Sequence, residues 1–296
     1  MHQLKAWISA ARLRTLPLSI SGIIVGSALG FDQFLSSSIF WLAILTTISF
    51  QVLSNFANDY GDGIKGTDDH REGEKRLVAS GLISEKQMKT GMGIMALLSL
   101  GLSLLLIYNA FGCENLLLSL VFFGFGALSV IAAIKYTVGD NAYGYSGFGD
   151  VFVFLFFGWL SVIGSYYLFV MEWHLPLVLP ATAIGLLSMA VLNLNNMRDI
   201  ENDAKSGKET LVVKWGREKA KKYHYVLIIC ALVAAITHTV LHFYSFKQFL
   251  YLIAFIPLLL NIKTVYQNKE PRLLYSELKK VALSTFAFAI LFSMFH

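Results

Sequence analysis

The sequence predicts an all-α membrane protein, a polytopic bundle of about nine transmembrane helices. Of its 296 residues, 56% are hydrophobic and only 15% are charged, whereas a soluble domain carries about 25% charged residues. Long, nearly charge-free stretches recur along the chain, each close to the ~20 residues that a helix needs to cross a bilayer. The basic residues are also spread unevenly among the connections between these stretches. Together these observations exclude an ordinary soluble protein.

Each apolar stretch is expected to be a helix, because a spanning helix satisfies its own backbone polar groups. In chain order the stretches are Thr15–Gly30, Ile39–Asn55, Met88–Ala110, Leu116–Ile134, Val151–Met171, Leu175–Leu194, Tyr225–Leu241, Phe249–Tyr266 and Val281–Phe295. Ahead of them, Met1–Arg14 is expected to lie along the membrane interface as an amphipathic helix, with Trp7 as an anchor. We expect residues 1–296 to form a single domain.

The basic residues predict the orientation. All of the 24 Lys and Arg residues except Lys247 fall in the N-terminal segment or in every second connection. The positive-inside rule then places the N-terminus in the cytoplasm and the C-terminus outside. A different parity of spans would destroy this separation, so the charge pattern supports nine. The net charge of +5 is therefore a topological signal for a multi-pass protein of the cell (inner) membrane. We expect no nucleic-acid partner and no obligate protein partner.

Two acidic motifs follow the second and sixth apolar stretches, on the predicted cytoplasmic side. The first reads N-F-A-N-D-Y-G-D-G-I-K-G-T-D-D over Asn55–Asp69, and the second reads N-L-N-N-M-R-D-I-E-N-D over Asn193–Asp203. Carboxylates beside hydrocarbon are costly unless a cation gathers them. Mg2+ takes oxygen ligands and commonly bridges carboxylates and phosphates. The motifs therefore indicate an enzyme that acts on a diphosphate at a membrane surface, with Mg2+ as cofactor.

Spacings of three and four residues would place the acids of each motif on one helix face. The predicted metal ligands are Asp59, Asp62, Asp199 and Asp203. Basic residues within or just after the motifs could hold the diphosphate directly, Arg as a bidentate donor and Lys as a point charge. These are Arg198, the strongest candidate, with Lys65, Arg76 and Lys208.

A third segment, K-Y-T-V-G-D-N-A-Y-G-Y-S-G-F-G-D from Lys135 to Asp150, combines tyrosines with glycines. Such a loop can pack close to a ligand, and its tyrosines can stack and donate hydrogen bonds. The candidates are Tyr136, Tyr143 and Tyr145. An aromatic belt at the membrane interface is the alternative interpretation.

Taken together, the three segments resemble the intramembrane aromatic prenyltransferases of the UbiA superfamily, over essentially the whole chain. The pattern N-D-Y-G-D-G-I-K-G-T-D is most similar to the naphthoate branch of that superfamily. The common first motif has another Asp at the position of Gly66, whereas here the next acid is Asp68. This form argues against the 4-hydroxybenzoate branch.

The resemblance implies a helical bundle around a cavity open to the cytoplasm and to lipid, with polyprenyl diphosphate and 1,4-dihydroxy-2-naphthoate as substrates. The four metal-binding acids would hold Mg2+ on the diphosphate, and Arg198 would neutralise the leaving group. The allylic C–O bond would break, and the naphthoate ring would attack the resulting carbocation with loss of CO2. Asp68, Tyr136 or Tyr143 would orient or deprotonate the acceptor. Asn55, Asn58, Lys65, Arg76, Tyr145, Asn195 and Lys208 would bind substrate.

Other functions remain open at this point. A prenyltransferase for 4-hydroxybenzoate, homogentisate or a porphyrin would keep the enzyme class and change the acceptor. A cation transporter would also use acidic sites, but such sites tend to lie near the bilayer midplane on broken helices. A membrane scaffold would leave both acidic motifs unexplained.

Overall fold

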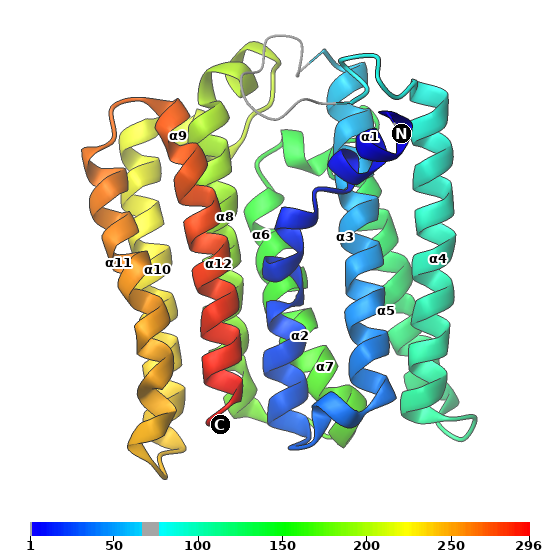
Figure 1. The fold of residues 1–296 in the computed structure, drawn as a ribbon, viewed down its shortest axis with the longest axis vertical. Coiled ribbons are helices and arrows are strands. Elements are labelled where there is room, and N and C mark those ends of the chain that lie inside the picture. Colours follow the sequence, from blue (N-terminus) through cyan, green and yellow to red (C-terminus); the bar gives the residue numbers. More distant parts are fainter. Residues whose placement is uncertain (1, 67–76) are drawn as a thin grey trace. The chain divides into compact units, whose positions relative to one another are not determined.

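The computed structural model describes residues 2–66 and 77–296, and within them every regular element is helical (Figure 1). The helices are α1 (His2–Ala11), α2 (Leu16–Gly30), α3 (Ser38–Ile64), α4 (Glu85–Phe111), α5 (Leu116–Lys135), α6 (Gly149–Val153), α7 (Ser161–Val170), α8 (Val178–Lys205), α9 (Leu211–Trp215), α10 (Arg217–Leu241), α11 (Leu252–Gln267) and α12 (Leu274–Ser293). A π-helical stretch, Phe154–Leu160, joins α6 to α7. The all-α prediction is confirmed.

Eight helical stretches of the described chain are long and apolar enough to cross a membrane. They coincide with the first eight stretches predicted from the sequence. The ninth predicted stretch lies in α12, whose first two turns carry Glu277, Lys279 and Lys280. Several helices are longer than the hydropathy predicted. The helices α3 and α8 continue through the acidic motifs to Ile64 and Lys205, and α10 begins earlier, at Arg217.

Two compact units make up the structure, and the chain passes between them several times. The first unit contains residues 1–16, 42–149 and 199–214, and the second contains residues 17–41, 150–198 and 215–296. The acidic end of α3, residues 199–205 of α8 and residues 135–149 of the tyrosine-rich segment belong to the first unit. The second motif up to Arg198 and Asp150 belong to the second unit.

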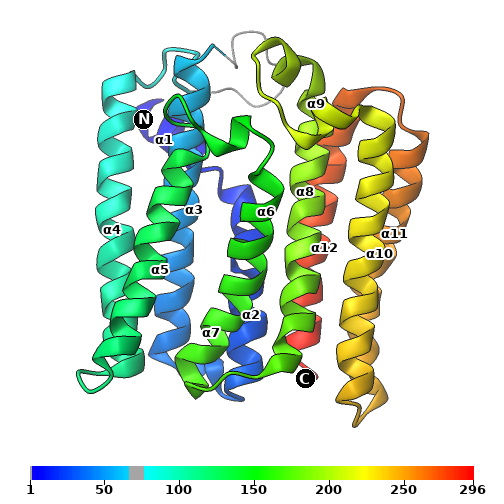
Figure 2. The same ribbon diagram turned by 180° about the vertical axis from the view of Figure 1, so that it is seen from behind.

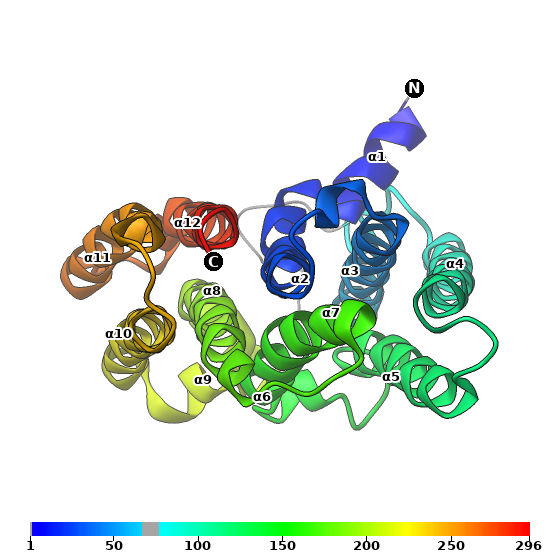
Figure 3. The same cartoon turned by 90° about the horizontal axis from the view of Figure 1, so that it is seen from below.

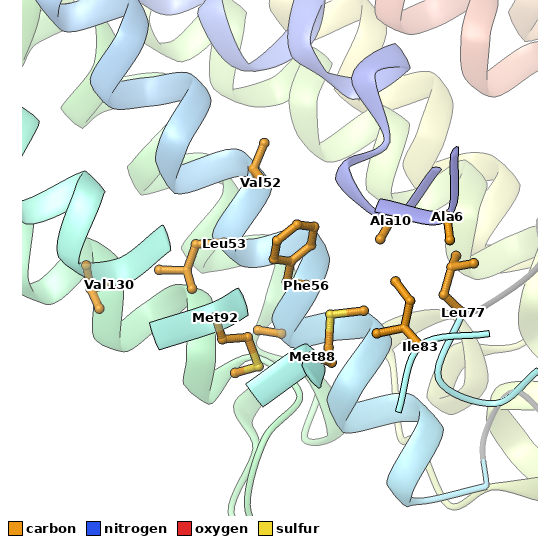
Figure 4. Close-up of a cluster of buried hydrophobic side chains, with 11 residues drawn as sticks. Ala6, Ala10, Val52, Leu53, Phe56, Leu77, Ile83, Met88, Met92 and Val130 are labelled. Carbon is orange, nitrogen blue, oxygen red and sulfur yellow. The ribbon is translucent and has the colours of Figure 1, made fainter. Parts of the chain in front are cut away.

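The first unit is built on α3, α4 and α5, with α4 packed along α5 (Figures 1 and 3). At one end of α3, apolar side chains of α1, α4 and the segment after residue 76 form a buried cluster (Figure 4). Its members are Ala6, Ala10, Val52, Leu53, Phe56, Ala57, Leu77, Ile83, Met88, Met92 and Val130. Trp7 of α1 packs on Phe56, with ring centres 5.2 Å apart. This cluster holds α1 and the start of α4 beside the acidic end of α3.

In the second unit, the continuous column of α6, the π-helical stretch and α7 runs beside α8 (Figure 2). A Cβ on Gly158 would lie 2.7 Å from the Ala181 carbonyl oxygen and from Gly185 Cα. The two backbones can therefore approach closely only because both positions are glycine, as is common where helices pack within membranes.

A chain of buried polar groups joins α10, α11 and α12, which neighbour one another in Figure 3. The His224 Nε2 atom lies 2.7 Å from Asn261 Oδ1, and Asn261 Nδ2 donates to the Glu277 carboxylate at 2.6 Å. Lys280 Nζ lies 2.6 Å from the other oxygen of that carboxylate. Because unpartnered polar groups are costly in an apolar bundle, Asn261 is the link on which the other groups depend.

Replacing this link should destabilise the second unit. Asn261→Leu leaves the Glu277 carboxylate without a buried donor, so we expect the free energy of unfolding to fall by about 2 kcal/mol. Thermal unfolding in detergent micelles would measure the change. Thr264→Leu on the same helix is the matched control, because the exposed Thr264 hydroxyl donates within its own helix, to the Leu260 carbonyl. Equal melting temperatures for the two variants would contradict a stabilising role for the polar chain.

Candidate functional site

The acidic motifs are helical, and their acids are buried. Asp59 and Asp62 lie in the last two turns of α3 and are 1% and 2% exposed. Asp199 and Asp203 lie in the last two turns of α8 and are 8% and 4% exposed. Four buried carboxylates at the ends of two apolar helices require donors or cations close by.

Asp62 has both kinds of partner. The Tyr145 hydroxyl donates to Asp62 Oδ1 at 2.8 Å, and Lys208 Nζ lies 3.7 Å from the same oxygen. The Lys65 ammonium lies 3.8 Å from the centre of the Tyr145 ring, and the Lys208 ammonium lies 5.2 Å from it. Three predicted segments therefore meet at one buried carboxylate.

The pKa of Lys65 is shifted by these surroundings. Partial burial lowers the pKa of Lys65 and the neighbouring Lys208 acts in the same direction, while Asp62 and Asp140 oppose them. Its ammonium also donates to the Gly139 carbonyl at 3.0 Å. Two ammonium groups are thus held around one tyrosine ring beside Asp62, which is an arrangement suited to an anionic ligand.

The tyrosine-rich segment is anchored on α3 through Thr137, which sequence reasoning missed. The buried Thr137 hydroxyl donates to the Ala57 carbonyl at 2.9 Å and lies 3.2 Å from Asn58 Oδ1. Its backbone passes so close to α3 that a Cβ on Gly61 would lie 2.7 Å from the Thr137 carbonyl oxygen. The signal was present in the motif Y-T-V-G, but the importance of the threonine depends on a glycine far away in the sequence.

The chain that follows α8 also contacts the tyrosine-rich segment. The Glu209 backbone N–H donates to the Tyr145 carbonyl at 3.0 Å, and Lys214 Nζ donates to the Ser146 carbonyl at 3.1 Å. The Lys208 N–H donates to the Asp203 carbonyl at 2.8 Å, which closes the end of α8. Within the first unit, the tyrosine-rich segment therefore contacts both the acidic end of α3 and the chain that follows the acidic end of α8.

Asp59 has a different environment from Asp62. Its Oδ2 accepts the Leu77 backbone N–H and its Oδ1 accepts the Val78 backbone N–H, both at 3.1 Å. These donors belong to the segment that leads into α4. The two acids of the first motif, only three residues apart, therefore have unlike partners.

Some residues that were predicted to act on the substrate form hydrogen bonds or ring contacts with other parts of the protein. Asn55 Nδ2 donates to the Ala11 carbonyl at 2.8 Å and lies 3.3 Å from Thr15 Oγ1, which ties the end of α1 to α3. The Tyr143 hydroxyl donates to the Ala132 carbonyl at 2.8 Å, and burial raises the pKa of Tyr143. Tyr136 packs edge-on against Tyr143, with ring centres 5.3 Å apart.

The remaining predicted residues lie elsewhere. Arg198 and Asn195 belong to the second unit, where the Arg198 guanidinium donates to Asn195 Oδ1 at 2.8 Å and lies 5.9 Å from the centre of the Tyr275 ring. Asp68 and Arg76 lie outside the described residues.

No group of three or more His, Cys, Asp and Glu side chains in the described ranges is already arranged to hold a metal ion. The donor chemistry nevertheless suits a hard divalent cation, because the buried side chains offered are carboxylates. A cation already lies at one of them, since the Lys208 ammonium faces Asp62. Fold and site together define a polytopic membrane protein with buried carboxylates at the ends of two apolar helices.

The chain belongs to the UbiA prenyltransferase family, whose model matches residues 19–292, and it is an integral membrane protein. It is 42% identical to the 1,4-dihydroxy-2-naphthoate octaprenyltransferase of Haemophilus influenzae, over 99% of this chain and 96% of that protein. The enzyme of the same name from Escherichia coli is also 42% identical, over 90% of this chain and 87% of that protein.

Solved structures share the fold. A UbiA homologue from Archaeoglobus fulgidus, bound to GPP and Mg2+, matches with a TM-score of 0.66 and 16% identity, over 97% of this chain and 99% of that one. The same homologue has also been solved bound to Cd2+, and that structure matches with a TM-score of 0.60 and 16% identity, over the same shares of the two chains.

The contact between Gly61 and Thr137 gives a direct test of how the site is assembled. Gly61→Ala places a methyl group against the Thr137 backbone, so we expect a loss of about 2 kcal/mol in the free energy of unfolding. Gly93→Ala on α4 is the matched control, because its Cβ would meet nothing within 4 Å and alanine favours a helix. Thermal unfolding would measure both. A Gly61→Ala variant as stable as the control would contradict the close packing.

Proposed function

We propose that this protein transfers a polyprenyl group from polyprenyl diphosphate to 1,4-dihydroxy-2-naphthoate, with loss of CO2 and diphosphate, in menaquinone biosynthesis. The acceptor is supported by the two relatives that are 42% identical over most of both chains and carry this activity in their names. The reaction class is supported by one structural observation: a buried carboxylate, Asp62, meets Tyr145 and Lys208 from two other segments, and Lys65 lies over the Tyr145 ring.

Asp62, Asp199 and Asp203 would hold Mg2+ on the diphosphate. All three are buried carboxylates in the first unit, and the homologue structure with GPP also contains Mg2+. When bound, Mg2+ would neutralise negative charge that builds on the departing diphosphate.

Lys65 and Lys208 would bind the diphosphate directly as point charges. Their ammonium groups flank the Tyr145 ring, and that ring is fixed by its own hydrogen bond to Asp62. Arg198 would add a bidentate donor from the other acidic motif. These preorganised charges favour departure of the diphosphate because they are in place before the bond breaks.

The reaction requires two bonds to break, the allylic C–O bond and the C–C bond between the ring and its carboxylate, and one C–C bond to form. The allylic carbon leaves the diphosphate oxygen, and the electron-rich ring carbon that bears the carboxylate attacks it as CO2 departs. No electrons are gained or lost, so demethylmenaquinone is formed at the quinol level. Apolar helices would exclude water from the allylic cation. Asn58 would contact substrate, because Thr137 holds its amide in place.

We also propose that the protein is a single catalytic domain of the cell (inner) membrane, with the site on the cytoplasmic side. The family match spans residues of both units, and the basic residues accumulate in the connections that carry the acidic motifs, as the positive-inside rule expects of the cytoplasmic side. Nine spanning helices would place the C-terminus outside.

Product formation in membranes tests the proposal. With 1,4-dihydroxy-2-naphthoate and a polyprenyl diphosphate, the wild type should form the demethylmenaquinone skeleton only when Mg2+ is present. Asp199→Asn should lower the rate by about a hundredfold or more, because it removes one preorganised negative ligand. Chromatography with mass detection would measure the product.

Other acceptors distinguish the alternatives in the same assay. Turnover of 4-hydroxybenzoate, and none of the naphthoate, would overturn the proposed acceptor and keep the reaction class. Ion flux in proteoliposomes that is lost in Asp199→Asn, with no turnover of any acceptor, would favour the transporter instead.

The Tyr145 hydroxyl supplies a narrower prediction. Tyr145→Phe keeps the ring beside both lysines and removes the donor to Asp62, so we expect kcat to fall about tenfold. Tyr108→Phe is the matched control, because Tyr108 is exposed on α4 away from the site. Steady-state kinetics would measure both variants. An unchanged kcat in Tyr145→Phe would show that this hydrogen bond does not support catalysis.

A further inference from the structure

We propose that Asp59 is a positioning residue that fastens the segment before α4 to α3, and that it is not a magnesium ligand. The inference deepens the proposed function, on which it rests, because it divides the first acidic motif into one structural acid and one metal-binding acid. Sequence spacing alone placed both acids among the metal ligands.

The two oxygens of Asp59 are each engaged by the backbone. Leu77 N–H donates to Oδ2 and Val78 N–H donates to Oδ1, at 3.1 Å each. Asp59 is 1% exposed and Leu77 is 3% exposed. Hydrogen bonds from backbone N–H groups to a buried carboxylate are among the stronger ones in proteins, and backbone donors cannot rotate away as side chains can.

Further contacts fix the same segment. The Leu77 side chain lies in the buried cluster with Ala6 and Ala10 of α1 (Figure 4). The Ile83 N–H donates to the Leu77 carbonyl at 3.1 Å. A Cβ on Gly63 would lie 2.9 Å from the Val78 side chain, so glycine permits this close approach to α3.

Asp62 differs from Asp59 in the property that metal binding requires. Its partners include two side-chain groups, the Tyr145 hydroxyl and the Lys208 ammonium. Such groups can move aside when a cation arrives. If both oxygens of Asp59 bound a metal ion, the ion would compete with the Leu77 and Val78 N–H groups for those oxygens. Loss of these hydrogen bonds would loosen Leu77 and Val78, which are packed on α1 and α3.

Asp59 and Asp62 therefore have different roles, although they lie within one turn of α3. Asp59 holds the segment that leads to Ser84, the capping residue of α4, and so fixes the surroundings of the turn that presents Asp62. Asp59 therefore acts on the reaction through the position of α3 and α4, whereas Asp62 acts through the metal.

Purified Asp59→Asn and Asp62→Asn should separate these roles, with two measurements on each. Binding of Mn2+ in the presence of inorganic diphosphate would be followed by electron paramagnetic resonance, and stability by thermal unfolding without metal. We expect Asp59→Asn to keep the Mn2+ dissociation constant within about threefold of the wild type and to melt several degrees lower. The melting temperature falls because the amide NH2 group of the introduced asparagine would face a backbone N–H, and two donors cannot form a hydrogen bond. Asp62→Asn should weaken Mn2+ binding at least about tenfold.

Gly63→Ala provides a second route that leaves every carboxylate intact. It should push Val78 away from Asp59, lower the melting temperature and leave Mn2+ binding unchanged, with Gly93→Ala as the control. The double variant with Asp59→Asn should lose less stability than the two single losses added together, because both changes break one contact.

Weakened Mn2+ binding in Asp59→Asn comparable to that in Asp62→Asn would overturn the inference, as would an unchanged melting temperature in both Asp59→Asn and Gly63→Ala. The thermal measurement needs no metal, so it tests the positioning role independently. A wild type that binds no Mn2+ with diphosphate would count against the proposed function instead.

Discussion

The burial of four carboxylates at the ends of two apolar helices is the constraint on which the rest of the structure depends. Each buried charge must be matched by donors or cations, since an unpaired charge next to hydrocarbon is very costly. The described contacts show two solutions. Asp59 takes two backbone N–H groups, whereas Asp62 takes a tyrosine hydroxyl and a lysine. The first solution stabilises the fold, and the second keeps a negative charge available to a ligand.

Glycine and threonine make the second solution possible. The segment that carries Tyr145 can reach Asp62 only because Gly61 lets the backbone at Thr137 lie directly on α3, and the Thr137 hydroxyl then bonds to the Ala57 carbonyl. The connection after α8 packs on the same segment through Glu209 and Lys214. A loop of small residues and tyrosines therefore contacts α3 and the chain after α8, and its Tyr145 ring lies beside the ammonium groups of Lys65 and Lys208.

Much of this architecture was predictable from sequence, and the exceptions have physical reasons. Composition and charge distribution predicted an all-α membrane protein, because hydrophobic length and basic connections act directly on membrane insertion. Hydropathy missed the last turns of α3 and α8, since those turns are polar and are helical nonetheless. The meeting of Lys65, Tyr145 and Lys208 was expected as a site, but the Thr137 anchor depends on a distant glycine. The different roles proposed for Asp59 and Asp62 could not be predicted from the sequence, because every residue except proline carries a backbone N–H donor and only the fold shows which donors reach Asp59.

The most direct test of the account is the position of the metal in the assembled site. Crystals of the wild type grown with Mn2+ and an unreactive prenyl thiolodiphosphate would locate the ion by its anomalous scattering. The account predicts Mn2+ bonded to an Asp62 oxygen, with ligands from Asp199 or Asp203, and Asp59 still bonded to Leu77 and Val78. An ion bonded to Asp59 with those backbone hydrogen bonds broken, or no ion near Asp62, would contradict it.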